Sequence, residues 1–151
     1  MNTISVTNKG LELVFEPIEH KYTVGDDIYT SVTTLVKSYF PVFDSDGIAT
    51  KYANKHGLNK EDVLKSWDDN NKIASDFGTK IHLWAESLLK KESIDEVGTD
   101  KELNYLSSLK EWIDGVFFER FELIECEKMI FSPKYKIAGT IDVLARNKKT
   151  G

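Results

Sequence analysis

The sequence predicts a mixed α/β (α+β) fold in which helices flank a central mixed β-sheet. Three stretches carry this prediction: a period-two alternation of apolar residues at 11–16, a helical periodicity over 60–91, and two β-rich segments at 121–131 and 137–146. Helices and strands each have an apolar side to bury, and packing the C-terminal hairpin against the long helix would cover both. Ahead of this core, the N-terminal alternation predicts a small β-meander.

A single domain is expected, because 151 residues with 40% hydrophobic content suffice for one substantial core. We expect the meander in 1–30, helices in 31–118 and the core hairpin in 119–151. The chain has one cysteine, which excludes an intrachain disulfide and a four-cysteine zinc or iron–sulfur site. Four residues are expected in the core: Trp67, Trp84, Trp112 and Cys126.

Composition also bears on location and partners. Residues 1–9 lack the apolar core of a signal peptide, and no run approaches the roughly 18 apolar residues of a membrane span. We therefore expect a cytoplasmic protein with no membrane partner. The net charge of −5 speaks against a whole-surface attraction to DNA, because phosphate contacts need clustered lysine and arginine. A local basic groove remains compatible with it.

Three basic neighbourhoods interrupt the acidic average. They are Lys51, Lys55, His56 and Lys60; Lys134 and Lys136; and Lys148 and Lys149. Charge runs are more often solvated surface than binding sites, so each neighbourhood also has that simpler interpretation.

The predicted meander has three strands. They occupy 11–16, 21–24 and 28–29, with Pro17 and the turn Gly25-Asp-Asp as the breaks between them. This spacing of short strands and turns is typical of antiparallel neighbours.

Two short helices are predicted next. The Ser31-Val-Thr-Thr stretch offers N-caps for a helix over 35–40, which Pro41 ends. The following helix is expected over 45–56, where Gly57 supplies the C-terminal cap.

A long helix is predicted from the periodicity over 60–91, with Asn59 as its N-cap. It is either continuous or broken once. Its weakest points are 68–71 and Gly78, because Asn, Asp and Gly are poor residues inside a helix, so we expect a bend there. Thr99 and Glu102 then form a capping box for a helix that ends near Phe118.

The β-rich segments 121–131 and 137–146 are predicted to be adjacent antiparallel strands. Alternation places Asp142 on the same face as Ala138, opposite to Gly139. If the connection has four residues, Glu127 pairs directly with Asp142, whereas a five-residue loop turns Glu127 to the other face. The sequence leaves both registers open.

Several of these residues are candidate metal ligands. A spacing of four puts His82 and Glu86 on one helix face. Asp142 lies inside an apolar segment, where an ionised carboxylate is costly unless it is paired or bound to a metal. Simpler interpretations exist, because Glu86 could be the i,i+4 partner of Lys90, and Glu127 could belong to a solvated strand face. A lone helical histidine is also more often structural than a ligand.

The stretches Gly78-Thr-Lys-Ile-His82 and Gly139-Thr-Ile-Asp142 resemble two motifs of RecB-like, phage-type exonucleases in the PD-(D/E)XK superfamily. The resemblance covers most of the chain. It implies a restriction-endonuclease-like core, DNA as the partner, and metal-binding and catalytic roles for His82 and Asp142. Position alone adds Glu86 as a further candidate metal ligand and Glu127 as a further candidate catalytic residue. The family's third motif, an acidic residue, a spacer and a lysine, has no counterpart here and is expected on a strand after residue 151.

This resemblance predicts Mg²⁺ or Mn²⁺ as the cofactor, because phosphodiester hydrolysis needs a hard cation with oxygen ligands and open positions for water and phosphate. An imidazole ligand favours tolerance of Mn²⁺. The expected activity is that of a DNA exonuclease in phage or mobile-element recombination or repair. A non-catalytic DNA-binding or assembly domain is the alternative. A zinc hydrolase fits less well because the chain has no His-Glu-x-x-His motif.

The missing motif has two further consequences. The 151-residue chain is expected to be inactive or nearly inactive as a nuclease, because the remaining carboxylate and the lysine would be absent. The edge formed by 137–146 would also be unpaired, and exposed strand edges recruit other chains, so self-association through this segment is predicted.

Overall fold

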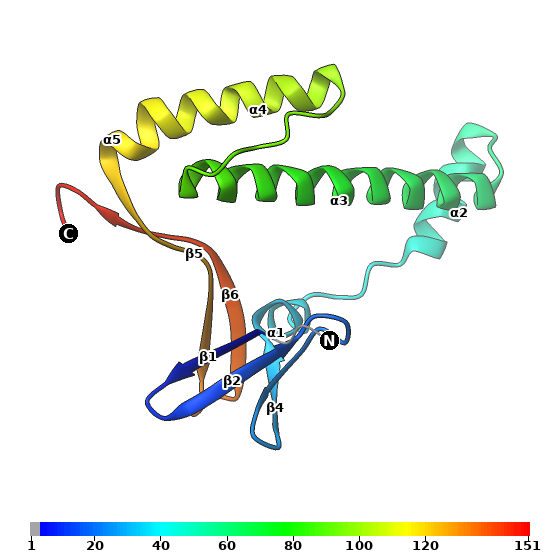
Figure 1. Ribbon diagram of the computed structural model, residues 1–151. Helices are drawn as coiled ribbons and strands as arrows, with labels where there is room; N and C mark the ends of the chain where they lie inside the picture. Colours follow the sequence, from blue (N-terminus) through cyan, green and yellow to red (C-terminus); the bar gives the residue numbers. More distant parts are fainter. Residues whose placement is uncertain (1–3) are drawn as a thin grey trace. The chain divides into compact units, whose positions relative to one another are not determined.

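The computed structural model describes residues 4–151 and divides the chain into two compact units (Figure 1). Unit 1 comprises the residues up to Pro41 together with Leu123–Ala145. Unit 2 comprises Val42–Glu122 together with Arg146–Gly151. The chain has the expected mixed α/β character, with a mixed six-stranded sheet and helices. The restriction-endonuclease-like core and the single domain stay predictions.

The N-terminal meander is confirmed and has one strand more than expected. Its strands are β1 (Ile4–Asn8), β2 (Leu11–Glu16), β3 (Lys21–Val24) and β4 (Asp27–Ser31). Each pairs antiparallel with the next, and the pairs include Val6 with Leu13 and Tyr22 with Tyr29. Strand β1 was missed because only Ile4 and Val6 mark its apolar positions, too few for a periodic signal.

The C-terminal strands β5 (Phe121–Ser132) and β6 (Ile137–Asn147) are neighbours in the sheet, whose strand order is β1-β2-β3-β4-β6-β5. The predicted unpaired edge at 137–146 is wrong at its start, because Ile137 and Ala138 pair in parallel with Thr30 and Ser31 of β4. The pairing of β4 with β6 could not be predicted from the sequence, because the two strands are far apart in the chain and no short-range residue pattern indicates their contact. Self-association stays a prediction, which light scattering of the purified protein tests.

The connection between β5 and β6 has the four residues 133–136. Simple counting would then pair Glu127 with Asp142. Glu127, however, has a φ of +52°, and the buried residues on either side, Cys126 and Met129, are three positions apart. Strict alternation is therefore interrupted, as at a β-bulge, where one extra residue enters a strand. Neither register considered from the sequence included a bulge.

The core of unit 1 lies on one side of this sheet. It consists of Leu13, Tyr22, Tyr29, Met129 and Ala138. After β4 the chain enters the helix α1 (Val32–Lys37), where the Ser31 side chain accepts a hydrogen bond from the Thr34 amide. Helix α1 therefore begins and ends three residues earlier than predicted.

Unit 2 begins with the helix α2 (Ser45–His56), which has the predicted bounds and the predicted left-handed Gly57 cap. It packs on α3 (Lys60–Lys90) through a small cluster of Ala49, Ala53 and Val63. Asn59 caps α3 as expected by accepting hydrogen bonds from two backbone amides. These confirmations share a cause, since a cap depends on residues only two or three positions away.

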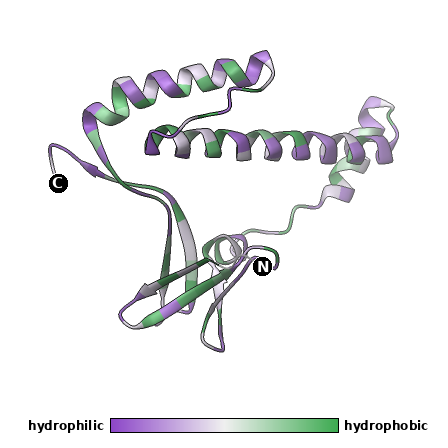
Figure 2. Cartoon of the chain, viewed as in Figure 1, coloured by the Kyte–Doolittle hydropathy of each residue, from purple (hydrophilic) through white to green (hydrophobic). Residues whose placement is uncertain are grey.

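Helix α3 is a single uninterrupted helix of 31 residues, along which Figure 2 shows hydrophilic and hydrophobic residues interleaved. Of the two forms that the sequence left open, a continuous helix and a once-broken one, the structure has the continuous helix. An ion pair between Lys72 Nζ and Asp76 Oδ2, 3.0 Å apart, links the turn after the weak stretch to the next one. Propensity is a weak prior that such pairs and tertiary packing override.

The next helix, α4 (Asp100–Trp112), begins with the predicted Thr99–Glu102 capping box. It continues into a π-helical turn, Ile113–Phe117, and the short α5 (Phe118–Arg120).

Trp112 was expected in the core, yet 50% of it is exposed. Ile113 and Phe117, the first and last residues of the π-helical turn, are buried instead. The predictions for buried Trp84 and Cys126 are confirmed. Trp67 is half-buried.

Candidate functional site

His82 and Glu86 lie one turn apart on α3, within unit 2. His82 is exposed, and it forms no hydrogen bond or ion pair with the described residues of its unit. Glu86 is half-buried, and its Oε1 lies 2.5 Å from Lys90 Nζ. The simpler interpretation of Glu86 as the partner of Lys90 is therefore confirmed. The pair still presents one imidazole and one carboxylate on the same helix face.

Gly78 lies one turn before His82 and leaves its helix surface uncovered. A Cβ atom added at Gly78 would meet no heavy atom within 4 Å. The glycine is therefore not explained by close packing inside unit 2, although glycine inside a helix costs about 0.5–1 kcal/mol relative to alanine. Glycine at such a position is typical of a surface to which another group must come close.

Asp142 lies in β6 and Glu127 in β5, and both belong to unit 1. The Asp142 side chain is exposed, so the expectation that its charge needs a partner inside an apolar environment is wrong. The face assignment agrees with the structure: Ala138 on that face is in the core, and Thr140 Oγ1 hydrogen bonds to Tyr22 Oη at 3.3 Å. Asp142 follows these residues on the same face, where its carboxylate is open to solvent or to an ion.

The four candidate ligands thus divide into two pairs, one on each unit. Within neither unit do three or more histidine, cysteine, aspartate or glutamate side chains of residues 4–151 group closely enough to hold a metal ion. Unit 2 supplies one nitrogen and one oxygen ligand, and unit 1 supplies carboxylate oxygens. Imidazole with carboxylates is a donor set that Mn²⁺ accepts readily and that Mg²⁺ accepts when water fills other positions.

Two of the basic neighbourhoods are partly neutralised. Lys60 forms an ion pair with Asp46, and the hydrogen bond to that carboxylate raises the pKa of Lys60 above its ordinary value. Lys136 Nζ lies 2.7 Å from Asp27 Oδ1, and this hydrogen bond raises the pKa of Lys136 likewise. In the third neighbourhood, Lys148 Nζ donates a hydrogen bond to the Phe118 carbonyl at 2.5 Å.

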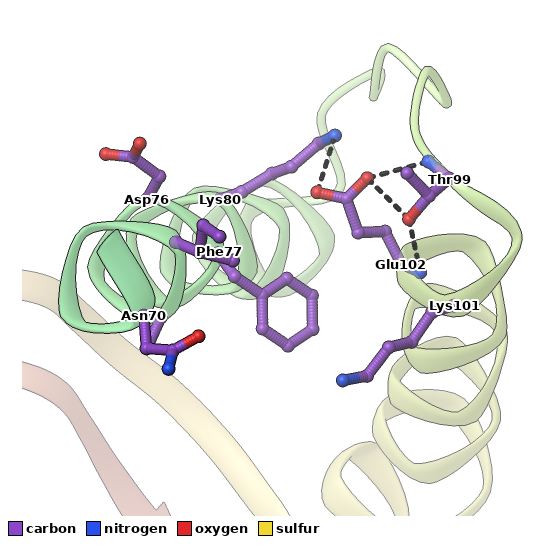
Figure 3. Close-up of a pocket in the computed structure, with 9 residues that line it drawn as sticks. Asn70, Asp76, Phe77, Lys80, Thr99, Lys101 and Glu102 are labelled. Atoms are coloured by element: carbon purple, nitrogen blue, oxygen red, sulfur yellow. Dashed lines mark hydrogen bonds and ion pairs between the residues drawn. The ribbon is translucent and has the colours of Figure 1, made fainter. Parts of the chain in front are cut away.

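A groove between α3 and the start of α4 was not anticipated. It has a volume of about 530 Å³ and an apolar floor that includes Phe77 (Figure 3). On its rim Glu102 accepts hydrogen bonds from the Thr99 amide at 2.7 Å and hydroxyl at 3.0 Å, and its other oxygen lies 3.2 Å from Lys80 Nζ. The capping box was readable from the sequence, but the contact with Lys80 required the packing of the two helices.

Two further findings complete this description. Among residues 4–151 no helix is both long enough and apolar enough to cross a membrane. Models of protein families, curated proteins and solved structures were compared with the chain, and none of them matches it.

Proposed function

We propose that this protein is a metal-dependent DNA nuclease that uses His82 and Glu86 of α3 together with Asp142 of β6 as metal ligands. The observation that carries the proposal is the exposed His82 on the helix face that Gly78 leaves uncovered. An imidazole with no partner in its unit, beside open backbone and one turn from a carboxylate, is available to an ion and to a phosphate. The exposed Asp142 supports it by leaving a second carboxylate accessible.

The ion is Mg²⁺ or Mn²⁺ in this proposal. When bound, it would polarise the scissile phosphate and lower the pKa of an attacking water. His82 and Asp142 would hold the ion. Glu86 would be a weaker ligand, because Lys90 already interacts with its carboxylate. Glu127 is the candidate for a further carboxylate in catalysis. The acidic residue and lysine of the third motif are not assigned to residues of this chain.

The substrate class in this proposal is linear DNA, degraded by an exonuclease of phage or mobile-element recombination or repair. This finer assignment rests on the two sequence motifs, Gly78 to His82 and Gly139 to Asp142. Comparing linear DNA with closed circular DNA of the same sequence tests it, since an exonuclease needs an end. Cleavage of both at equal rates would replace it with an endonuclease assignment.

Hydrolysis of labelled DNA by the protein in its full-length form, with Mn²⁺ or Mg²⁺, tests the proposal directly. His82→Ala and Asp142→Ala should each lower the rate by roughly 100-fold or more, because a metal contributes several kcal/mol of transition-state stabilisation. The matched controls are Asp76→Ala on α3 and Asp26→Ala in unit 1, which remove exposed carboxylates outside the motifs. Full activity in a folded Asp142→Ala protein would contradict the assignment.

The alternative, a DNA-binding or assembly domain without catalysis, predicts a different result. Such a protein would bind DNA without cleaving it under any divalent metal. It would also be insensitive to His82→Ala. Binding and cleavage measured on the same preparation separate the two.

A further inference from the structure

A run of four aromatic rings lies along the surface of unit 2, over α2 and the start of α3. The ring centroids of Tyr52 and His56 are 4.4 Å apart, those of Tyr52 and Trp67 are 6.4 Å apart, and those of Phe43 and Trp67 are 6.4 Å apart. Phe43 is 66% exposed and Tyr52 45% exposed. The rings are therefore within reach of a flat group from outside the protein.

Basic side chains accompany these rings on one helix face. Lys51, Tyr52, Lys55 and His56 follow the i, i+1, i+4, i+5 spacing that keeps residues on one side of α2. Both lysines are exposed, and neither forms an ion pair with the described residues of unit 2. They differ in this from Lys60, which is held by Asp46. Free ammonium groups beside exposed rings are complementary to phosphates that follow stacked bases.

A hollow of about 350 Å³ adjoins two of the rings. Tyr52 and Trp67 form part of its wall, and Asn59, Asp62, Ser66 and Asn70 line it with polar groups. Its volume lies in the range of roughly 300–1,000 Å³ that small-ligand sites occupy. Aromatic walls with hydrogen-bonding side chains suit a planar heterocycle, and the Asp62 carboxylate can accept from the amino group of a base.

We propose that this surface binds single-stranded DNA, with an unpaired base entering the hollow beside Tyr52 and Trp67 and with Lys51 and Lys55 contacting the flanking phosphates. Single strands fit and duplexes do not, because in a duplex the ring faces are already stacked on neighbouring base pairs and the hydrogen-bonding edges are paired. The inference shares with the proposed nuclease only the choice of DNA as ligand. Single-strand binding is measured in EDTA, where metal-dependent cleavage does not occur. The binding proposal and the nuclease proposal can therefore fail independently of each other.

The first test is fluorescence anisotropy of a labelled strand of about 12 deoxycytidylates, whose amino groups can donate to Asp62 and whose length is within the site sizes of single-strand binding domains. Tyr52→Ala should weaken binding by about 5- to 150-fold, the equivalent of 1–3 kcal/mol for one stacked base. Tyr52→Phe should bind like the natural protein because it keeps the ring. Tyr105→Ala is the matched control, since Tyr105 is also an exposed tyrosine of unit 2, 52% exposed, but lies on α4.

The second test is the dependence of affinity on salt. The double variant Lys51→Gln, Lys55→Gln should lower the slope of log K against log salt by about 1.4, or about 0.7 for each phosphate contact with a single strand. Lys72→Gln, Lys101→Gln should leave the slope unchanged. Equal affinity of Tyr52→Ala and Tyr105→Ala would overturn the inference. Tighter binding to duplex than to single strands would overturn it as well.

Discussion

Gly139 of β6 lies directly against Val32 of α1: a Cβ atom added to the glycine would come within 3.0 Å of Val32 Cγ2 and 3.4 Å of its Cβ. The glycine in the Gly139 to Asp142 motif therefore has a structural task of its own, because it lets α1 approach the sheet. This separates it from Gly78 of the other motif, which has no neighbour of this kind.

Gly139→Ala should destabilise the protein by about 1–3 kcal/mol, the usual cost of forcing an extra methyl group into a packed contact. Urea unfolding at equilibrium measures the change. Val32→Ala should recover part of the loss in the double variant, because it removes the methyl groups that the new Cβ meets. Additive effects of the two substitutions would show that the contact is not the cause.

Gly78→Ala should have the opposite effect on stability. Open space around the position lets alanine enter without strain, so the protein should gain about 0.5–1 kcal/mol from better helix propensity. Under the nuclease proposal the same variant should lose cleavage activity, because the methyl group covers backbone beside His82. A stabilised variant with full activity would remove Gly78 from the argument for a site on this face.

Glu86→Ala should reduce cleavage less than Asp142→Ala does. The carboxylate of Glu86 is engaged by Lys90 at 2.5 Å, whereas Asp142 is exposed and available. Rates at saturating and at limiting Mn²⁺ test this, since loss of a weak ligand should be largely restored by more metal. If Glu86→Ala is as inactive as Asp142→Ala at saturating Mn²⁺, Glu86 is a principal ligand and Lys90 does not compete for it.

Glu102 should make stability depend on pH in the acid range. The hydrogen bond from the Thr99 amide, followed by that from the Thr99 hydroxyl, holds the pKa of Glu102 below its ordinary value of 4.5. The unfolded chain then binds this proton more readily than the folded one. The stabilisation is therefore complete above about pH 4.5 and is lost as pH falls through the lower folded pKa.

The contribution of Glu102 to the pH dependence of stability is checked by measuring the thermal unfolding of the Glu102→Gln variant from neutral pH to below pH 4.5. Glutamine can keep the capping geometry but does not titrate, so the variant should lose less stability on acidification than the natural protein. Glu111→Gln, an exposed position on the same helix, is the control and should follow the natural protein. Parallel curves for all three proteins would contradict the role of Glu102.

Local chemistry decided what could be predicted from the sequence. The caps at Gly57, Asn59 and Thr99 all lie where the sequence places them, because each uses hydrogen bonds to backbone only a few residues away. The same applies to the i,i+4 pair of Glu86 and Lys90 and to the face of β6 that carries Asp142. Periodicity and short-range spacing contain this information in full.

Tertiary structure alone decided the rest. The parallel pairing of β4 with β6 and the close approach of Gly139 to Val32 each depend on segments far apart in the chain. Trp112 is exposed although the apolar periodicity of its helix predicted it in the core, whereas its neighbour Ile113 is buried. Long-range pairings, close contacts and the exposure of single residues depend on how whole helices and strands pack against one another, and local sequence does not determine that packing.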